Sequence, residues 1–135
     1  MWANDRRAVV GVSRERALAD CLSPQWAAAH DTPLVAVDQD GGRIVGYSTG
    51  VTGFSHGVYS CDEVLARLHY EMTQRTLTGR RDDDVLLKLF GRLTPALMRW
   101  ALTHGGLRLQ RQATVMVLGS YADPSGGVYV PTMLY

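Results

Sequence analysis

Three side chains that can take up or release a proton stand next to one another at His69, Tyr70 and Glu71. In a β-strand alternate side chains share a face, so His69 and Glu71 would point the same way. They would then form a general base that acts directly or through a water molecule. In an α-helix the two side chains diverge, and these residues become polar positions on an amphipathic helix. Both interpretations stay open.

The element that must position these residues spans residues 61–78, and its pattern fits two periods. Apolar residues recur at helical spacing along one face, at Val64, Leu65, Leu68 and Met72. Ser60 and Glu63 have the spacing of a capping box, which predicts the start of a helix. Residues 65–72 also alternate with a period of two, which favours a strand. The pattern alone does not separate helix from strand.

Several other kinds of catalytic site lack their sequence signature. The four histidines do not form an HxxxH or HExxH pair, so we expect no metal site. The chain contains neither a G-x-S-x-G nucleophile motif nor a nucleotide-binding P-loop. Cys21 and Cys61 lie far apart and form neither a CxxC pair nor a zinc spacing, so we expect two reduced, buried thiols, with a single disulfide as the alternative.

Length and charge limit the function classes further. The chain has 135 residues and a mass of 14.9 kDa, which predicts a single domain over residues 1–135. Its formal net charge of +1 does not support a general attraction to nucleic acid or to an anionic membrane. No apolar stretch approaches the roughly 20 residues that a membrane-spanning helix needs. We therefore expect a cytoplasmic protein that binds neither a membrane nor nucleic acid.

The strongest structural signal is a β-hairpin over residues 34–52. An apolar run from Leu34 to Val37 is followed by a turn sequence, Asp38 to Gly42, and by the returning strand Arg43 to Ser48. The aspartates and glycines of the turn tolerate the positive φ angles of tight hairpin connections. The hairpin predicts an antiparallel strand pair.

Further elements follow from periodicity and from turn residues. We expect strands at 7–12, 107–118 and 128–135, and helices that begin after Asp84 and at Thr94-Pro95. Gly105 and Gly106 are expected to end the second of these helices. The order of elements predicts an α/β (α+β) fold with a single mixed sheet and helices on its faces.

The hairpin resembles the second and third strands of the GNAT superfamily of N-acetyltransferases. From residue 34 the stretch reads LVAVDQDGGRIVGY: an apolar strand, an acidic turn with glycines, then Ile-Val-Gly-Tyr. The element order also agrees with that superfamily. The resemblance implies a GNAT-like fold and transfer of an acetyl or acyl group from acyl-CoA to an amine. The acceptor amine would belong to a small molecule or to a protein.

Members of the superfamily hold the pyrophosphate of acetyl-CoA in a Gln/Arg-x-x-Gly-x-Gly/Ala loop before a helix. Backbone amides and the helix dipole make such a loop an anion site. Here the corresponding stretch departs from the motif, because its glycine is shifted by one position and three aspartates follow it. The resemblance places the coenzyme contacts at Arg75, Thr76, Thr78, Gly79, Arg80 and Arg81. The arginines would donate directly to phosphate, or Asp82, Asp83 and Asp84 would neutralise them as surface ion pairs.

The resemblance also assigns catalytic roles. Tyr121, just after the strand predicted at 107–118, would protonate the leaving thiolate, and His69 or Glu71 would act as the base. A second interpretation is a non-catalytic ligand- or protein-binding module on a similar scaffold. The apolar C-terminal strand and three tryptophans favour association, so we expect a homo-oligomer such as a homodimer.

Overall fold

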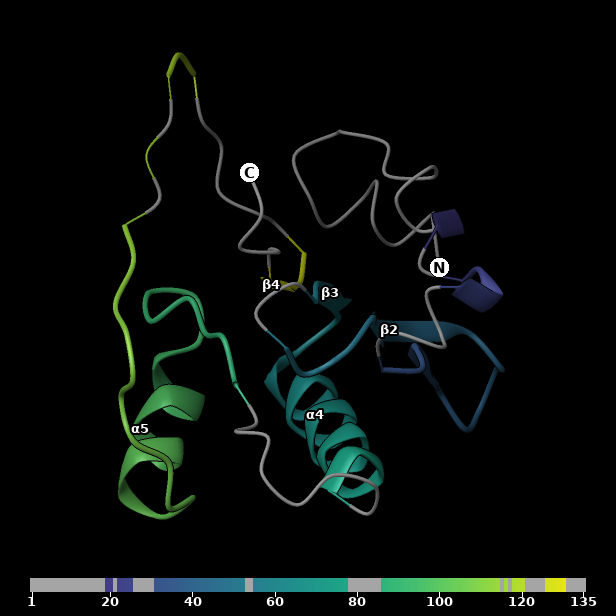
Figure 1. Ribbon diagram of the computed structural model, residues 1–135, viewed down its shortest axis with the longest axis horizontal. Coiled ribbons are helices and arrows are strands. Elements are labelled where there is room, and N and C mark those ends of the chain that lie inside the picture. The colour runs from purple at the N-terminus through teal and green to yellow at the C-terminus, as the bar shows by residue number, and fades with distance from the viewer. Residues whose placement is uncertain are drawn as a thin grey trace.

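The computed structural model describes residues 19–20, 22–25, 31–52, 55–77, 86–114, 116, 118–120 and 126–130 (Figure 1). These residues form an open four-stranded sheet in the order β1-β2-β3-β4, together with two helices. The elements are β1 (Leu34–Val37), β2 (Ile44–Ser48), β3 (Gly57–Tyr59), α4 (Asp62–Leu77), α5 (Pro95–Thr103) and β4 (Val128–Val130). The combination of helices with one sheet confirms the predicted class. None of the described helices is long and apolar enough to cross a lipid bilayer.

The sheet differs from the predicted mixed sheet, because every described strand pair is antiparallel. Antiparallel neighbours need only short connections, whereas parallel neighbours need a long crossover. β1, β2 and β3 follow one another through short connections, and β4 joins β3 in the antiparallel direction. The strand predicted at 7–12 lies outside the described residues.

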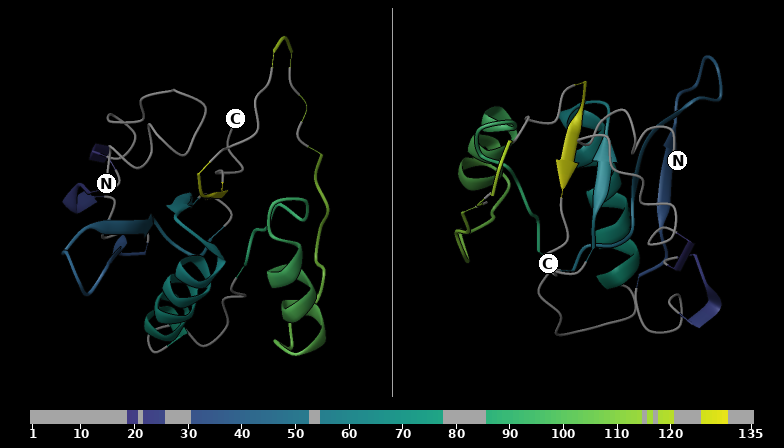
Figure 2. Two further views of the ribbon diagram at one scale, coloured as in Figure 1. Left: turned by 180° about the vertical axis from the view of Figure 1, so that it is seen from behind. Right: turned by 90° about the horizontal axis from the view of Figure 1, so that it is seen from above.

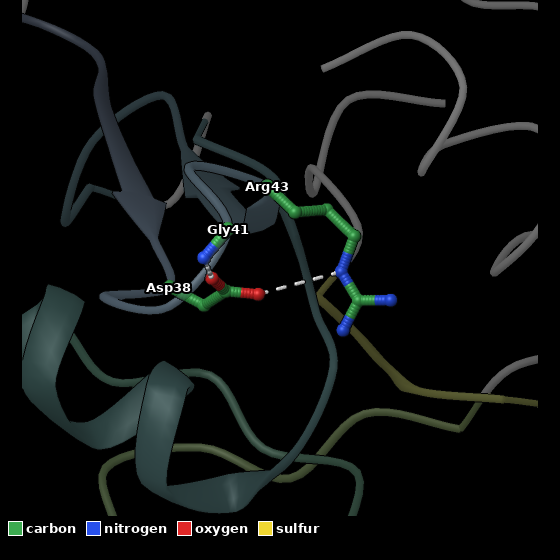
Figure 3. A network of polar contacts seen from close by, with 3 residues as sticks. All are labelled: Asp38, Gly41 and Arg43. Carbon is green, nitrogen blue, oxygen red and sulfur yellow. Dashed lines mark hydrogen bonds and ion pairs between the residues drawn. The ribbon is translucent and has the colours of Figure 1, made fainter.

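The predicted hairpin is confirmed as the β1–β2 pair, with its turn at residues 38–43. The backbone amide of Asp38 donates to the carbonyl of Arg43 over 2.9 Å and closes the turn. One carboxylate oxygen of Asp38 accepts from the amide of Gly41 at 2.7 Å, and the other lies 3.6 Å from Nε of Arg43 (Figure 3). Gly42 takes the positive φ, 64°, that the turn requires. Local turn chemistry therefore determines this element.

The strand register separates the two faces of the sheet. Tyr47, Val58 and Tyr129 pair across β2, β3 and β4 and form one buried cluster, against which Phe90 packs. The alternate residues of the same strands face α4, which contacts β1, β2 and β3 (Figure 2). Gly46 lies on the α4 face, where a Cβ would stand 2.7 Å from Cγ1 of Val64. The absence of a side chain at Gly46 is what lets the helix approach the sheet.

Within the ambiguous stretch 61–78, the described residues Asp62–Leu77 are helical. α4 buries Leu65, Leu68, His69 and Met72, at the i, i+3, i+4 and i+7 spacing of one helix face. The helix begins at Asp62, and the side chain of Cys61 hydrogen-bonds the Glu63 carboxylate and lowers its pKa. Ser60 instead donates its amide to the carbonyl of Val45. The predicted capping box with Ser60 is therefore wrong, although the observed helix begins only two residues after Ser60.

α5 begins with Pro95 in its first turn, as the Thr94-Pro95 sequence predicts. Thr94 is fully buried, but its hydroxyl donates to the carbonyl of Phe90 and does not cap the helix. Only Ala101 is buried along α5, while Trp100 and Leu102 are exposed. α5 therefore buries little of its apolar surface in the described structure.

Two predicted elements are absent from the described residues. Residues 86–90 are not helical: Leu87 and Leu89 pack into one apolar cluster and Phe90 into the other, which is the alternation of an extended chain. Residues 107–114 form no strand pair and run back alongside α5 (Figures 1 and 2). An alternating sequence becomes a strand only where a neighbouring strand meets its backbone groups. Of the strand predicted at 128–135, the structure describes only Val128–Val130.

Candidate functional site

A buried tyrosine–histidine pair joins β3 to α4. The hydroxyl of Tyr59 lies 3.1 Å from Nε2 of His69, at hydrogen-bonding distance. Both side chains are buried, and His69 is only 6% exposed. Tyr59 turns back over Gly57, where an added Cβ would lie 2.1 Å from the tyrosine oxygen and 2.6 Å from the carbonyl oxygen of Tyr47. Glycine at position 57 therefore makes room for the pair.

Burial keeps both members of this pair neutral. Loss of solvation, and then the positive charge of Lys88, lower the pKa of His69 to about 4. Burial raises the pKa of Tyr59, and a hydrogen bond with Ser48 opposes that rise. In the described structure Nδ1 of His69 is buried and has no hydrogen-bond partner. Leaving a buried polar atom unmatched costs about 1–3 kcal/mol, so Nδ1 of His69 is a position that a further polar group would stabilise.

Lys88 lies on the extended stretch 86–90, between two leucines of the apolar core. Its ammonium group donates to the backbone carbonyl of Ser55, and the amide of Leu86 donates to the carbonyl of Val51 at 3.2 Å. The stretch is thus held against the connection between β2 and β3. Loss of solvation lowers the pKa of Lys88 to about 8. At pH 7 this amine is therefore still mostly protonated, with about one-tenth of it neutral.

A second tyrosine–histidine pair lies at the other face of the sheet. The Tyr47 hydroxyl is 3.3 Å from Nε2 of His56, with the two rings edge to face. Thr49 holds His56 in place through two hydrogen bonds. The amide of His56 donates to the hydroxyl of Thr49, and the amide of Thr49 donates to the carbonyl of His56. Ser55 and His56 are therefore buried at the end of the β2–β3 connection.

Asp31 ties this connection to the end of α4. One of its carboxylate oxygens accepts from the amide of Val51 at 2.9 Å, and the other accepts from the hydroxyl of Thr76 at 3.1 Å. A Cβ at Gly50 would lie 2.9 Å from the first of these oxygens. One carboxylate therefore joins three segments that are far apart in the sequence.

The structure separates the two predicted bases. His69 points into the core, whereas Glu71 is exposed on α4 and pairs with Arg75 at 2.9 Å. Arg75 and Thr76 lie in the last turns of α4, where backbone amides are directed toward carbonyls one turn earlier. The other four predicted coenzyme contacts, Thr78, Gly79, Arg80 and Arg81, and also Tyr121, lie outside the described residues.

Sequence reasoning identified His69 but missed its partners. Tyr59 and Ser48 carry no local signal, because the contacts arise only when β3 packs on α4. Lys88 did have a signal, since it is the only lysine of the chain. No group of three or more His, Cys, Asp or Glu side chains suited to a metal ion gathers in the part of the chain that the structure describes.

Comparisons with models of known protein families, with curated proteins and with solved structures found no match to this chain.

Proposed function

We propose that the chain is a GNAT-like N-acyltransferase, which moves an acetyl or acyl group from acyl-CoA to an amine. The observation that carries the proposal is the buried, neutral imidazole of His69, with one ring nitrogen at Tyr59 and the other unmatched. A positioned neutral imidazole is the commonest general base in proteins. The resemblance of the 34–47 hairpin to the superfamily supplies the reaction class.

In the proposed reaction His69 handles the proton of the acceptor amine. The proposed mechanism requires the tautomer in which Nε2 carries the ring proton and donates a hydrogen bond to the oxygen of Tyr59, so that the lone pair is on Nδ1. The pKa near 4 keeps the ring uncharged at neutral pH, so its lone pair can accept a proton. Tyr121 remains the proposed donor of a proton to the leaving thiolate, and Glu71 is the less favoured base because it is exposed and paired with Arg75.

The coenzyme contacts rest mainly on four residues. The amides of Arg75 and Thr76 belong to the end of a helix, and the helix dipole is negative there. Arg75 is also paired with Glu71. A pyrophosphate would therefore be held by Thr78, Gly79, Arg80 and Arg81.

Calorimetric titration with acetyl-CoA and with free CoA tests the substrate. Saturable binding of both supports the proposal, and no heat of binding at millimolar CoA would overturn it. In a thiol-release assay, His69→Gln should lower kcat by about 10²–10⁴-fold. Glu63→Gln, on the exposed side of the same helix, is the matched control and should leave kcat unchanged. Circular dichroism confirms that both variants fold.

A second candidate function is a non-catalytic protein-binding module. It is favoured by apolar side chains that the structure leaves exposed on α5 and after it: Trp100, Leu102, Leu107, Leu109, Met116 and Leu118. Clustered exposed apolar surface is typical of protein contact sites. If CoA does not bind, this function takes precedence, and the partner it favours first is a second copy of the chain.

A further inference from the structure

Basic residues are unevenly distributed along this chain. Residues 85–122 include five of the 14 basic residues and none of the 13 acidic ones. The five are Lys88, Arg92, Arg99, Arg108 and Arg111. The formal net charge of +1 therefore averages a positive segment and a negative remainder. Because salt screens exposed charges beyond about 8 Å at physiological ionic strength, the local charge decides how this segment interacts with an anionic partner.

Three of these arginines are exposed on two neighbouring segments. Arg99 lies on α5, and Arg108 and Arg111 lie on residues 107–114, which run alongside α5 (Figures 1 and 2). Their guanidinium groups form no ion pair or hydrogen bond in the part of the chain that the structure describes. A guanidinium group carries five N–H donors in a planar fork, so all of these donors are available to a ligand.

Residues 107–114 also carry a row of exposed polar side chains. Arg108 is followed at alternate positions by Gln110, Gln112 and Thr114, and all four residues are exposed. Alternate residues of an extended chain share a face, so these side chains lie on one side and the two leucines of the segment on the other. Arginine, glutamine and threonine are among the side chains that contact phosphate groups in protein–DNA complexes. The polar side of the segment is therefore suited to a phosphodiester backbone.

We propose that α5 and residues 107–114 form a basic surface that binds the phosphodiester backbone of a nucleic acid. Arg99, Arg108 and Arg111 each donate to a phosphate group, whose oxygens match the guanidinium fork. A nucleic acid is favoured over an acidic protein because its phosphates form a continuous line, about one charge per 3.4 Å of each strand, opposite a row of donors. Phosphate contacts carry no sequence information, so binding is independent of sequence. The surface uses none of the residues assigned to the coenzyme or to proton transfer, so it is independent of the proposed acyltransferase function.

The experiment titrates the full chain into short, fluorescently labelled DNA duplexes of two unrelated sequences and measures anisotropy at several salt concentrations. Arg108→Gln combined with Arg111→Gln removes two of the three proposed phosphate contacts. Arg43→Gln combined with Arg67→Gln is the matched control, because it removes the same charge from exposed residues in the hairpin turn and on α4. Circular dichroism confirms that both double variants fold.

The wild type should bind both duplexes equally, with a Kd of about 10⁻⁴–10⁻⁶ M at physiological salt. The logarithm of its association constant should fall with the logarithm of salt concentration with a slope of about −2.7, the value for three phosphates. The 108/111 variant should bind about tenfold or more weakly, with a slope smaller by about two, and the control should match the wild type. Absence of saturable binding, or equal losses in the two double variants, overturns the proposal. Tighter binding of poly-glutamate than of DNA also overturns it and identifies an acidic protein as the partner.

Discussion

At the scale of single residues, two glycines are as important for the fold as the side chains around them. Gly57 leaves the space that Tyr59 occupies, and so permits its contact with His69. Gly42 has a different role, because no atom lies within 4 Å of an added Cβ there and only its positive φ favours glycine. Glycine is therefore needed at position 57 for packing and at position 42 for its backbone conformation.

Gly57→Ala should destabilise the fold by about 1–3 kcal/mol, since the new Cβ overlaps both the Tyr59 ring and a backbone carbonyl. Gly42→Ala should cost about 1 kcal/mol, the strain of a left-handed alanine. Urea unfolding measures both. Only Gly57→Ala should also shift the imidazole resonances of His69 in NMR spectra, and unchanged resonances would contradict the packing argument.

The pKa of His69 predicts how stability depends on pH. It is lower in the folded chain, about 4, than the usual 6.5, so the unfolded chain binds more protons between these values. The contribution of neutral His69 to the free energy of unfolding is complete above pH 7. This contribution falls by about 3 kcal/mol as the pH drops toward 4. Urea unfolding at several pH values measures it as the difference between the wild type and His69→Gln. His104→Gln, at an exposed histidine, is the matched control for the substitution itself.

At the scale of elements, single polar groups connect segments that lie far apart in the sequence. The β2–β3 connection is held by Asp31 at Val51, by Thr49 at His56 and by Lys88 at Ser55. The same carboxylate of Asp31 holds Thr76 near the end of α4. The last turns of a helix otherwise fray readily, so this contact stabilises the place where α4 ends.

Asp31→Ala should cost about 1–3 kcal/mol, because it removes two hydrogen bonds and leaves the Val51 amide unmatched. Hydrogen exchange at the Val51 amide should accelerate more than exchange at the centre of α4. Asp40→Ala, in the exposed hairpin turn, is the matched control and should stay within about 0.5 kcal/mol of the wild type. Equal exchange in both variants would argue against the role of Asp31.

At the scale of the whole molecule, apolar surface is unevenly distributed. The sheet and α4 bury their apolar faces, whereas α5 and the following residues expose theirs; Leu109 is 62% and Met116 88% exposed. Residues 107–114 also lack a strand partner in the described structure. A second copy of the chain would supply both an apolar face and backbone partners.

We predict that the chain associates, at least to a dimer, at tens of micromolar. Leu109→Glu combined with Met116→Glu should lower the mass measured by light scattering to that of a monomer, because two charges would be buried at the contact. Gln110→Glu with Gln112→Glu adds the same charge to the same exposed stretch and should preserve the assembly. A monomer mass for the wild type would rule out this association.

The local sequence was sufficient for the elements that begin or end at specialised residues. Asp38, Gly41 and Gly42 predicted the hairpin turn, and Pro95 predicted the first turn of α5. These residues act through their own backbone preferences and through bonds to positions three or four residues away. Such effects do not depend on what else the chain contacts, so they can be derived from the sequence.

Only the tertiary structure decided what depended on distant neighbours. Residues 61–78 fitted two periods until α4 packed its face on the sheet, and residues 86–90 are extended because the two apolar clusters take alternate side chains. His69 was a candidate from the sequence, but Tyr59 contacts it from 10 positions away, and the charge of Lys88, 19 positions away, lowers its pKa. The burial that keeps His69 and Tyr59 neutral and lowers the pKa of Lys88 exists only after the chain has folded, because solvation and dielectric environment are properties of the assembled core.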